Sequence, residues 1–117
     1  MDTLHSIIAG LTIITGIAAI IWPDVMSSFT GLKMTHPRGL VEMRAGIGAL
    51  FIGMGAAPWI LGHPIAYQML GIVYICVAVA RFPAMIILNS YEKSNWISLI
   101  IEVVFGVTLL IPLYPDL

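Results

Sequence analysis

Four long apolar segments, separated by short polar stretches, constrain this sequence more than any other feature. They cover about residues 4–22, 40–61, 65–88 and 96–114. Each has about the 20 residues that an α-helix needs, at a rise of roughly 1.5 Å per residue, to cross a hydrocarbon core of about 30 Å. We therefore predict an all-α fold: a polytopic membrane protein in which residues 1–117 form a single four-transmembrane-helix bundle with short loops.

The composition agrees with a membrane-embedded chain. Hydrophobic residues make up 60% of the sequence and charged residues only 9%, which lies outside the range of soluble domains. The net charge is −1 and no cluster of Lys or Arg is present, so nucleic acid is not expected as a partner. The expected partners are membrane lipid and other membrane protein chains, in a homo-oligomer or a larger complex.

The basic residues of the loops lie on one side of the predicted topology. Lys33 and Arg38 fall in the first loop and Lys93 in the third, whereas the second loop and both termini have no Lys or Arg. The positive-inside rule then predicts cytoplasmic first and third loops and both termini outside. The first loop, residues 23–39, fits either a short interfacial helix or an irregular polar loop.

Four charged residues lie inside the predicted spans or at their rim: Glu42, Arg44, Arg81 and Glu102. The helical rise places Arg44 roughly 6 Å, Glu102 roughly 9 Å and Arg81 roughly 10 Å from the cytoplasmic ends of their helices. A lone charge at mid-membrane costs about 2.5–3.5 kcal/mol, so opposite charges at one depth are expected to compensate each other.

Specific pairings follow from this layer. We expect Glu102 to pair with Arg81 or Arg44, and Glu42, nearer the headgroups, to find its partner on another helix, since Glu42 and Arg44 point to different sides of their own helix. Two roles stay open. In the first, Glu42 and Arg44 extend to the membrane interface, and Arg81 and Glu102 form a neutral ion pair that holds the bundle together. In the second, the layer is a network that binds an anionic headgroup, a quinone head or a transported ion.

Two further rows of residues stand out. The first is a face of the third helix with spacings of three and four, which either lines a polar crevice or packs with its tyrosine hydroxyls bonded to neighbouring helices. Its members are Tyr67, Gly71, Tyr74, Ala78 and Arg81. The second is a row of small residues four apart, which predicts close packing against an internal helix or another copy. It consists of Ala45, Ala49, Gly53 and Ala57.

The sequence contains no recognisable catalytic or metal-binding motif. His5, His36 and His63 all lie near span ends or in loops, and none has a second ligand three or four residues away. No nucleophile–base pair or phosphate-binding loop is present either. We therefore predict no metal, no cofactor and no catalytic residue, and expect a protein that is not an enzyme.

Residues 41–55, Val-Glu-Met-Arg-Ala-Gly-Ile-Gly-Ala-Leu-Phe-Ile-Gly-Met-Gly, resemble the second helix of a bacterial family of small four-helix membrane proteins of unknown function. That family carries Glu-x-Arg-Ala-x-x-Gly there, an Arg in the third helix and a Glu early in the fourth. The matching positions are Glu42, Arg44, Ala45, Gly48, Arg81 and Glu102. The chain departs from the family's frequent Tyr-Gly-Gly, where it has Gly46-Ile47-Gly48. The resemblance implies a location in a bacterial cytoplasmic membrane, a shared charged layer and no particular activity.

These features favour a small membrane protein that acts by binding. We expect either an accessory subunit of a larger membrane complex or a lipid- or quinone-binding bundle. The alternative is an oligomeric transporter of small solutes or ions. The small four-helix multidrug exporters have a similar length, but they place an essential Glu in the first helix, and the first segment here has no acidic residue.

Overall fold

The computed structural model describes residues 3–33 and 35–111, and all regular structure in these ranges is helical. In chain order the elements are α1 (Thr3–Ile21), α2 (Pro23–Thr30), α3 (Pro37–Glu42), the π-helix η1 (Met43–Ala49), α4 (Leu50–Leu61), α5 (Pro64–Ile87) and α6 (Lys93–Leu110). Because α3, η1 and α4 continue one another over Pro37–Leu61, four helices are long and apolar enough to cross a membrane. The predicted all-α four-helix architecture is confirmed.

The helix boundaries follow from local sequence signals. Both α3 and α5 begin with His-Pro: the His36 and His63 side chains accept a hydrogen bond from the backbone N–H two residues on, and the proline takes the first helical position. The second helix therefore starts at Pro37, earlier than predicted. The predicted end of the fourth segment, Tyr114, lies outside the described residues, and α6 ends at Leu110.

The link between the second and third long helices is very short. Gly62 ends α4 in the left-handed conformation, at φ 63°, which suits a residue without a Cβ. His63 then caps the N-terminus of α5. The chain thus reverses within two residues, and α4 and α5 must be antiparallel neighbours at this end.

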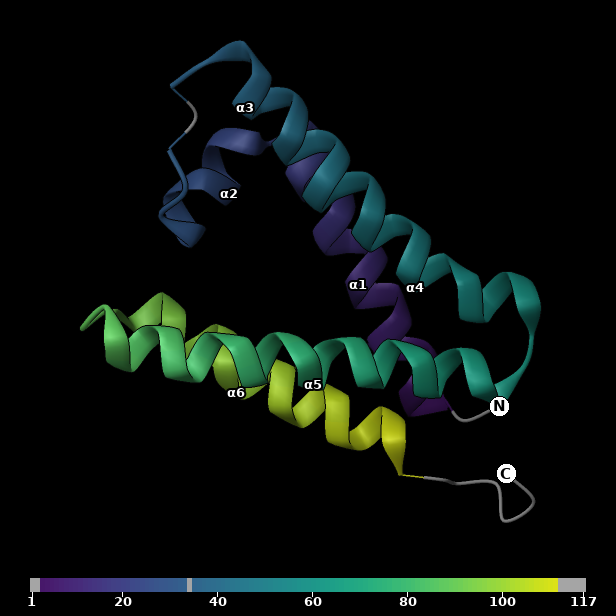
Figure 1. Ribbon diagram of the computed structural model, residues 1–117. Coiled ribbons are helices and arrows are strands. Elements are labelled where there is room, and N and C mark those ends of the chain that lie inside the picture. Colours follow the sequence, from purple (N-terminus) through teal and green to yellow (C-terminus); the bar gives the residue numbers. More distant parts are fainter. Residues whose placement is uncertain (1–2, 34, 112–117) are drawn as a thin grey trace.

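The first loop contains a short helix, and its location in the membrane interface stays a prediction. Pro23 occupies the first turn of α2, and Gly31 ends the helix with φ 76° while its N–H bonds to the Ser27 carbonyl. Part of α2 contacts α6. The short helix therefore lies at the end of the molecule that also carries α3 and the α5–α6 link (Figure 1).

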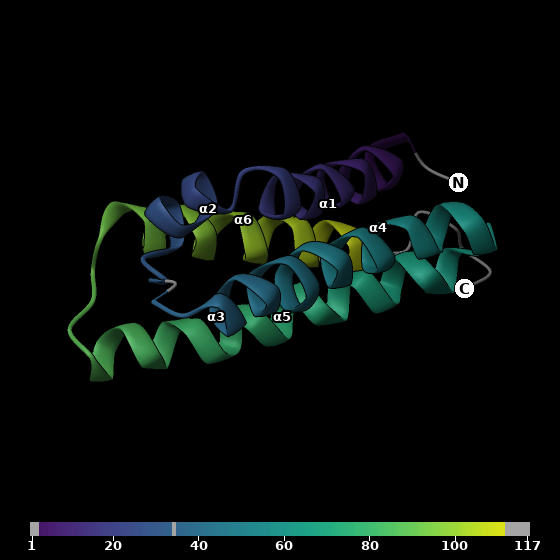
Figure 2. The ribbon, with the colours of Figure 1, turned by 90° about the horizontal axis from the view of Figure 1, so that it is seen from above.

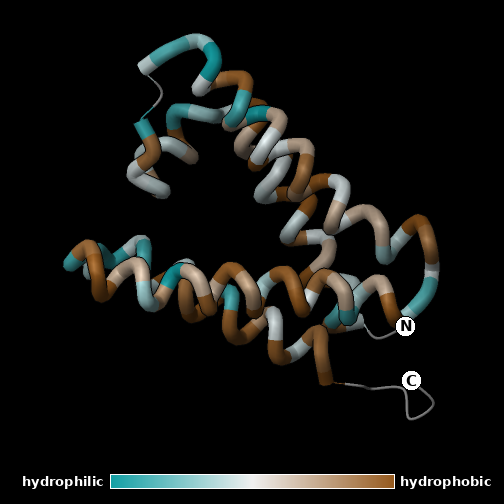
Figure 3. Tube along the Cα trace, in the orientation of Figure 1, coloured by the Kyte–Doolittle hydropathy of each residue, from teal (hydrophilic) through white to brown (hydrophobic). Residues whose placement is uncertain are grey.

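The four long helices form two antiparallel hairpins. One pairs α1 with the continuous helix Pro37–Leu61, and the other pairs α5 with α6. The hairpins meet near the α4–α5 turn, where α1 begins and α6 ends, and they diverge toward α2 and α3 (Figure 1). Seen from above, all four long helices run along the length of a molecule that measures 48 × 30 × 17 Å (Figure 2). Hydrophilic residues gather at the helix ends and links (Figure 3).

Glycines allow close approach within each hairpin. A Cβ on Gly55 would lie 2.6 Å from the Ala9 carbonyl oxygen, and one on Gly16 would lie 2.5 Å from the Gly48 carbonyl oxygen. In the other hairpin, a Cβ on Gly71 would lie 3.0 Å from the Gly106 carbonyl oxygen. Because backbone atoms cannot move aside as side-chain ends do, these positions fix the distance between the paired helices.

The row of Ala45, Ala49, Gly53 and Ala57, predicted to pack closely, does not face α1, and its packing against another copy stays a prediction. Ala45, Ala49 and Gly53 are exposed, and the Pro37–Leu61 helix presents Gly48 and Gly55 to α1 instead. Two rows of small residues run along this helix, and only one of them can face α1. Ala49, Gly53 and Ala57 of the other row lie on the side of this helix toward α5.

Candidate functional site

Arg81 of α5 and Glu102 of α6 form a close ion pair. The Arg81 Nε–H donates to Glu102 Oε1 at 2.9 Å and Oε2 at 3.2 Å, and the Arg81 Nη2–H donates to Oε2 at 2.8 Å. Glu102 is only 8% exposed, while the Arg81 side chain is 29% exposed. Hydrogen bonds from one guanidinium to both carboxylate oxygens are the strongest geometry for such an ion pair. The two charges therefore neutralise each other inside the α5–α6 hairpin.

Asn95 extends this ion pair toward the α5–α6 link. Arg81 Nη1–H donates to the Asn95 amide oxygen at 3.1 Å, and Asn95 Nδ2–H donates to the Ser90 hydroxyl at 2.9 Å. The Ser90 hydroxyl in turn donates to the Glu92 carboxylate, which lowers the pKa of Glu92 in the exposed link. A polar chain thus connects the buried carboxylate of Glu102 to the end of the molecule.

Asn95 was not among the predicted site residues, because the sequence pattern places it in the third loop. In the structure α6 begins at Lys93, so Asn95 is helical. It precedes Glu102 by seven residues, a spacing that returns to the same face of a helix. The spacing of seven residues between Asn95 and Glu102 was therefore the sequence signal that could have identified Asn95.

Glu42 and Arg44 do not join the Arg81–Glu102 pair. Among the residues that the structure describes, Glu42 has no ion-pair partner on another helix, contrary to the prediction. Instead Glu42 contacts Arg38, one turn earlier on its own helix, at 3.6 Å. Both side chains of this pair are well exposed, at 78% for Arg38 and 62% for Glu42. Arg44 is also exposed and forms no ion pair with an acid of the described residues.

The divergence of the hairpins explains this separation. At the end that carries α2 and α3, the Pro37–Leu61 helix lies apart from α5 and α6 (Figure 1). The early start of α3 also supplies Arg38 as a local partner, since residues four apart are neighbours on a helix. The predicted layer of four charges is therefore three separate features: the buried Arg81–Glu102 pair on one hairpin and, on the other, an exposed Arg44 and a Glu42 that contacts Arg38.

Tyr67 and Tyr74 of α5 connect the two hairpins toward the α4–α5 turn, away from α2 and α3. The Tyr67 hydroxyl shares a hydrogen bond of 3.1 Å with Ser6, and the Tyr74 hydroxyl shares one with Thr12, both on α1. The Tyr74 ring also packs edge-on against Phe105 of α6, with a centroid distance of 5.6 Å. This face of α5 is therefore packed against its neighbours, with its hydroxyl groups bonded to α1.

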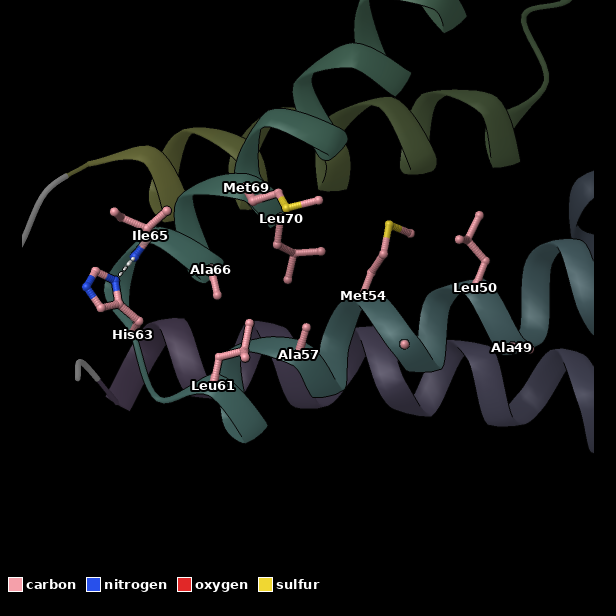
Figure 4. Close-up of a pocket in the computed structure, with 11 residues that line it drawn as sticks. Ala49, Leu50, Met54, Ala57, Leu61, His63, Ile65, Ala66, Met69 and Leu70 are labelled. Atoms are coloured by element: carbon pink, nitrogen blue, oxygen red, sulfur yellow. Dashed lines mark hydrogen bonds between the residues drawn. The ribbon is translucent and has the colours of Figure 1, made fainter.

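An apolar groove lies between α4 and α5, with a volume of about 730 Å³ (Figure 4). One wall carries Ala49, Gly53 and Ala57, and the facing wall carries Met69 and Leu70. The remaining lining residues of the described chain are Leu50, Met54, Leu61, His63, Ile65 and Ala66. Of all these side chains, only that of His63 is polar. The small residues that were predicted to pack a helix–helix interface therefore line an open apolar groove between α4 and α5.

The groove has the size and lining of a binding site for an apolar molecule. Ligand pockets in proteins commonly enclose about 300–1,000 Å³ and are lined mainly by hydrophobic side chains. His63 sits at its end near the α4–α5 turn, where its Nδ1 accepts the Ile65 N–H at 3.1 Å (Figure 4). The groove therefore suits a hydrocarbon chain better than a polar substrate.

Comparison with protein-family models, curated proteins and solved structures finds no significant match to this chain. The resemblance to a small four-helix bacterial family stays a prediction. We therefore infer function from the groove and from the distribution of charge around it.

Proposed function

We propose that this protein acts in a membrane by binding, and that it holds the apolar part of a lipid or quinone-like amphiphile in the groove between α4 and α5. The observation that carries this proposal is the wall of small residues. Ala49, Gly53 and Ala57 come one turn apart and leave room where larger side chains would close the gap between the helices. An accessory role in a larger complex fits the same groove, with a helix of another chain as its occupant.

Physical chemistry supports an occupied groove. When an apolar groove is empty, every atom that lines it lacks dispersion contacts on one side. Met54 and Met69 line the groove, and unbranched thioether side chains adapt their shape to an irregular apolar partner. A hydrocarbon chain in the groove restores these contacts without requiring hydrogen bonds.

We propose a membrane orientation from the positions of the basic residues in the links. Lys33, Arg38 and Lys93 all belong to the end of the molecule that carries α2, α3 and the α5–α6 link (Figure 1). Their position supports a cytoplasmic location for this end, with both chain termini outside, in a bacterial cytoplasmic membrane. The end of the molecule at which the hairpins diverge then faces the cytoplasmic side.

Filling the groove should remove the occupant. A Cβ on Gly53 has no heavy atom within 4 Å, so Gly53→Leu is expected to fold and to project its side chain into the groove that Gly53 lines. Native mass spectrometry after gentle solubilisation should find about one amphiphile per chain in the wild type and at least tenfold less in Gly53→Leu.

Gly10→Leu is the matched control. Gly10 lies on α1 with equally free space and does not belong to the lining, so this variant should retain the amphiphile. Equal retention by both variants would refute the groove as a binding site. A stoichiometric protein partner that is lost only from Gly53→Leu would favour the accessory-subunit form of the proposal.

Transport by several copies of the chain is the second candidate, and the buried carboxylate of Glu102 favours it. Acidic residues inside spans are common in proton-coupled pathways. The close contact with Arg81 speaks for a structural role instead. Proton-driven solute flux in liposomes that disappears in Glu102→Gln would favour transport over binding.

A further inference from the structure

Arg44 is a charged residue within a membrane-length helix and has no acidic partner in the described part of the chain. It belongs to Pro37–Leu61, is exposed, and lies near Glu42, which contacts Arg38. A charge within a span needs compensation or an aqueous route. An anion from outside the chain would provide that compensation.

The π-helix directs Arg44 away from α1. In a regular α-helix, residues four apart lie in one row, so Arg44 would share the row of Gly48. Gly48 faces α1, where an added Cβ would lie 2.5 Å from Ile20. Over Met43–Ala49 the bonding pattern is i to i+5, and the Leu50 N–H bonds back to the Ala45 carbonyl. The wider turn moves Arg44 from the row of Gly48 toward that of Ala49.

Ala49 and Leu50 form the end of the groove nearest to Arg44. Figure 4 places both residues at the far end of the groove from His63. Arg44 precedes Ala49 by five residues, which is one hydrogen-bonded turn of the π-helix. A molecule whose chain lies in the groove would therefore reach Arg44 with its headgroup.

The two ends of the groove differ in charge. Arg44 stands at one end, with Lys33 and Arg38 in the adjoining segments, whereas the sequence has no Lys or Arg from residue 45 to residue 80. Only the first end attracts an anion. A neutral quinone head would leave the charge of Arg44 uncompensated, but a phosphate accepts paired hydrogen bonds from a guanidinium.

We infer that Arg44 binds the phosphate of an anionic phospholipid from the leaflet on the α2–α3 side, with one acyl chain of that lipid in the α4–α5 groove. This inference rests on the proposed function and specifies the ligand's headgroup and leaflet. The ion pair of Arg81 and Glu102 takes no part in it, because its charges neutralise each other.

Native mass spectrometry with added phosphatidylglycerol or phosphatidylcholine tests the inference. The wild type should bind phosphatidylglycerol more tightly, and Arg44→Gln should weaken that binding about fivefold, as expected for one cationic contact with an anionic lipid. Arg44→Lys should keep most of the preference. Arg38→Gln makes the same charge change at an exposed residue that Glu42 already neutralises, and should alter binding less than about twofold.

Three outcomes would overturn the inference or separate it from the proposed function. Equal effects of Arg44→Gln and Arg38→Gln would show nonspecific attraction and contradict a site at Arg44. Inorganic phosphate that binds the wild type as tightly as phosphatidylglycerol does, and depends on Arg44, would reveal a free-anion site instead. In the third outcome, Gly53→Leu loses both lipids while Arg44→Gln keeps the wild-type headgroup preference. That result would support the groove as a binding site and refute only the phosphate site at Arg44.

Discussion

Replacement of Glu102 by Gln, with Arg81 kept, should lower the free energy of unfolding by about 3 kcal/mol. Removal of one partner of a buried ion pair costs about 3–5 kcal/mol because the other charge is left uncompensated, and the partial exposure of Arg81 places the effect at the lower end. The carboxylate also accepts the hydrogen bonds from Arg81 Nε and Nη2. Equilibrium unfolding in detergent mixed with sodium dodecyl sulfate measures this difference.

Two controls separate the loss of the pair from a general effect of charge. Glu42→Gln removes the same charge from the exposed contact with Arg38, and should change the free energy of unfolding by less than about 1 kcal/mol. A double change of Arg81→Leu and Glu102→Leu should recover most of the stability, since apolar replacement of both partners removes the unpaired charge. If Glu102→Gln and Arg81→Leu each left the stability unchanged, the two side chains would not depend on each other.

Two neighbouring glycines of α4 should respond to alanine with opposite signs. Gly55→Ala is expected to lower the free energy of unfolding by about 1–3 kcal/mol, the usual cost of overpacking a close contact. Its Cβ would lie 2.6 Å from the Ala9 carbonyl oxygen and 2.9 Å from the Ile13 backbone nitrogen. Gly53→Ala should raise the free energy of unfolding by up to about 1 kcal/mol through helix propensity, since its Cβ meets no atom.

The same unfolding assay measures both variants. Because the residues are two positions apart in one helix, they share its depth in the membrane and differ in the side of the helix that they face. A decrease of similar size in both variants would mean that α1 does not pack against Gly55. A stabilised Gly55→Ala would contradict the arrangement of the first hairpin.

Much of the fold was predictable because its causes are local. The long apolar segments determine the four helices, and Gly62 with His63-Pro64 marks the sharp reversal between α4 and α5. The pairing of Arg81 with Glu102 was one of two expected pairings, and the short link between α5 and α6 makes these helices neighbours. The sequence also indicated both alternatives for the first loop, of which the structure contains the helix.

Other features depend on how the helices rotate and diverge, which the sequence pattern does not specify. The rise per residue gave similar depths for Arg44 and Arg81, but depth does not determine lateral distance, and the hairpins separate at that end. Ala49 and Gly53 looked like packing residues because two rows of small residues lie on one helix. No sequence signal predicted the π-helical turn over Met43–Ala49. This turn helps to determine which row of small residues contacts α1.

Photochemical crosslinking in native membranes tests most directly whether the groove holds a bound amphiphile. A diazirine side chain would replace Met54, which lines the groove, or Val79, which is 66% exposed on α5 and lies outside the lining. We expect position 54 to give one predominant lipid adduct that saturates and is lost in Gly53→Leu, and position 79 to give a mixture that follows the bulk membrane composition. Matching bulk mixtures at both positions would contradict a bound amphiphile in the groove.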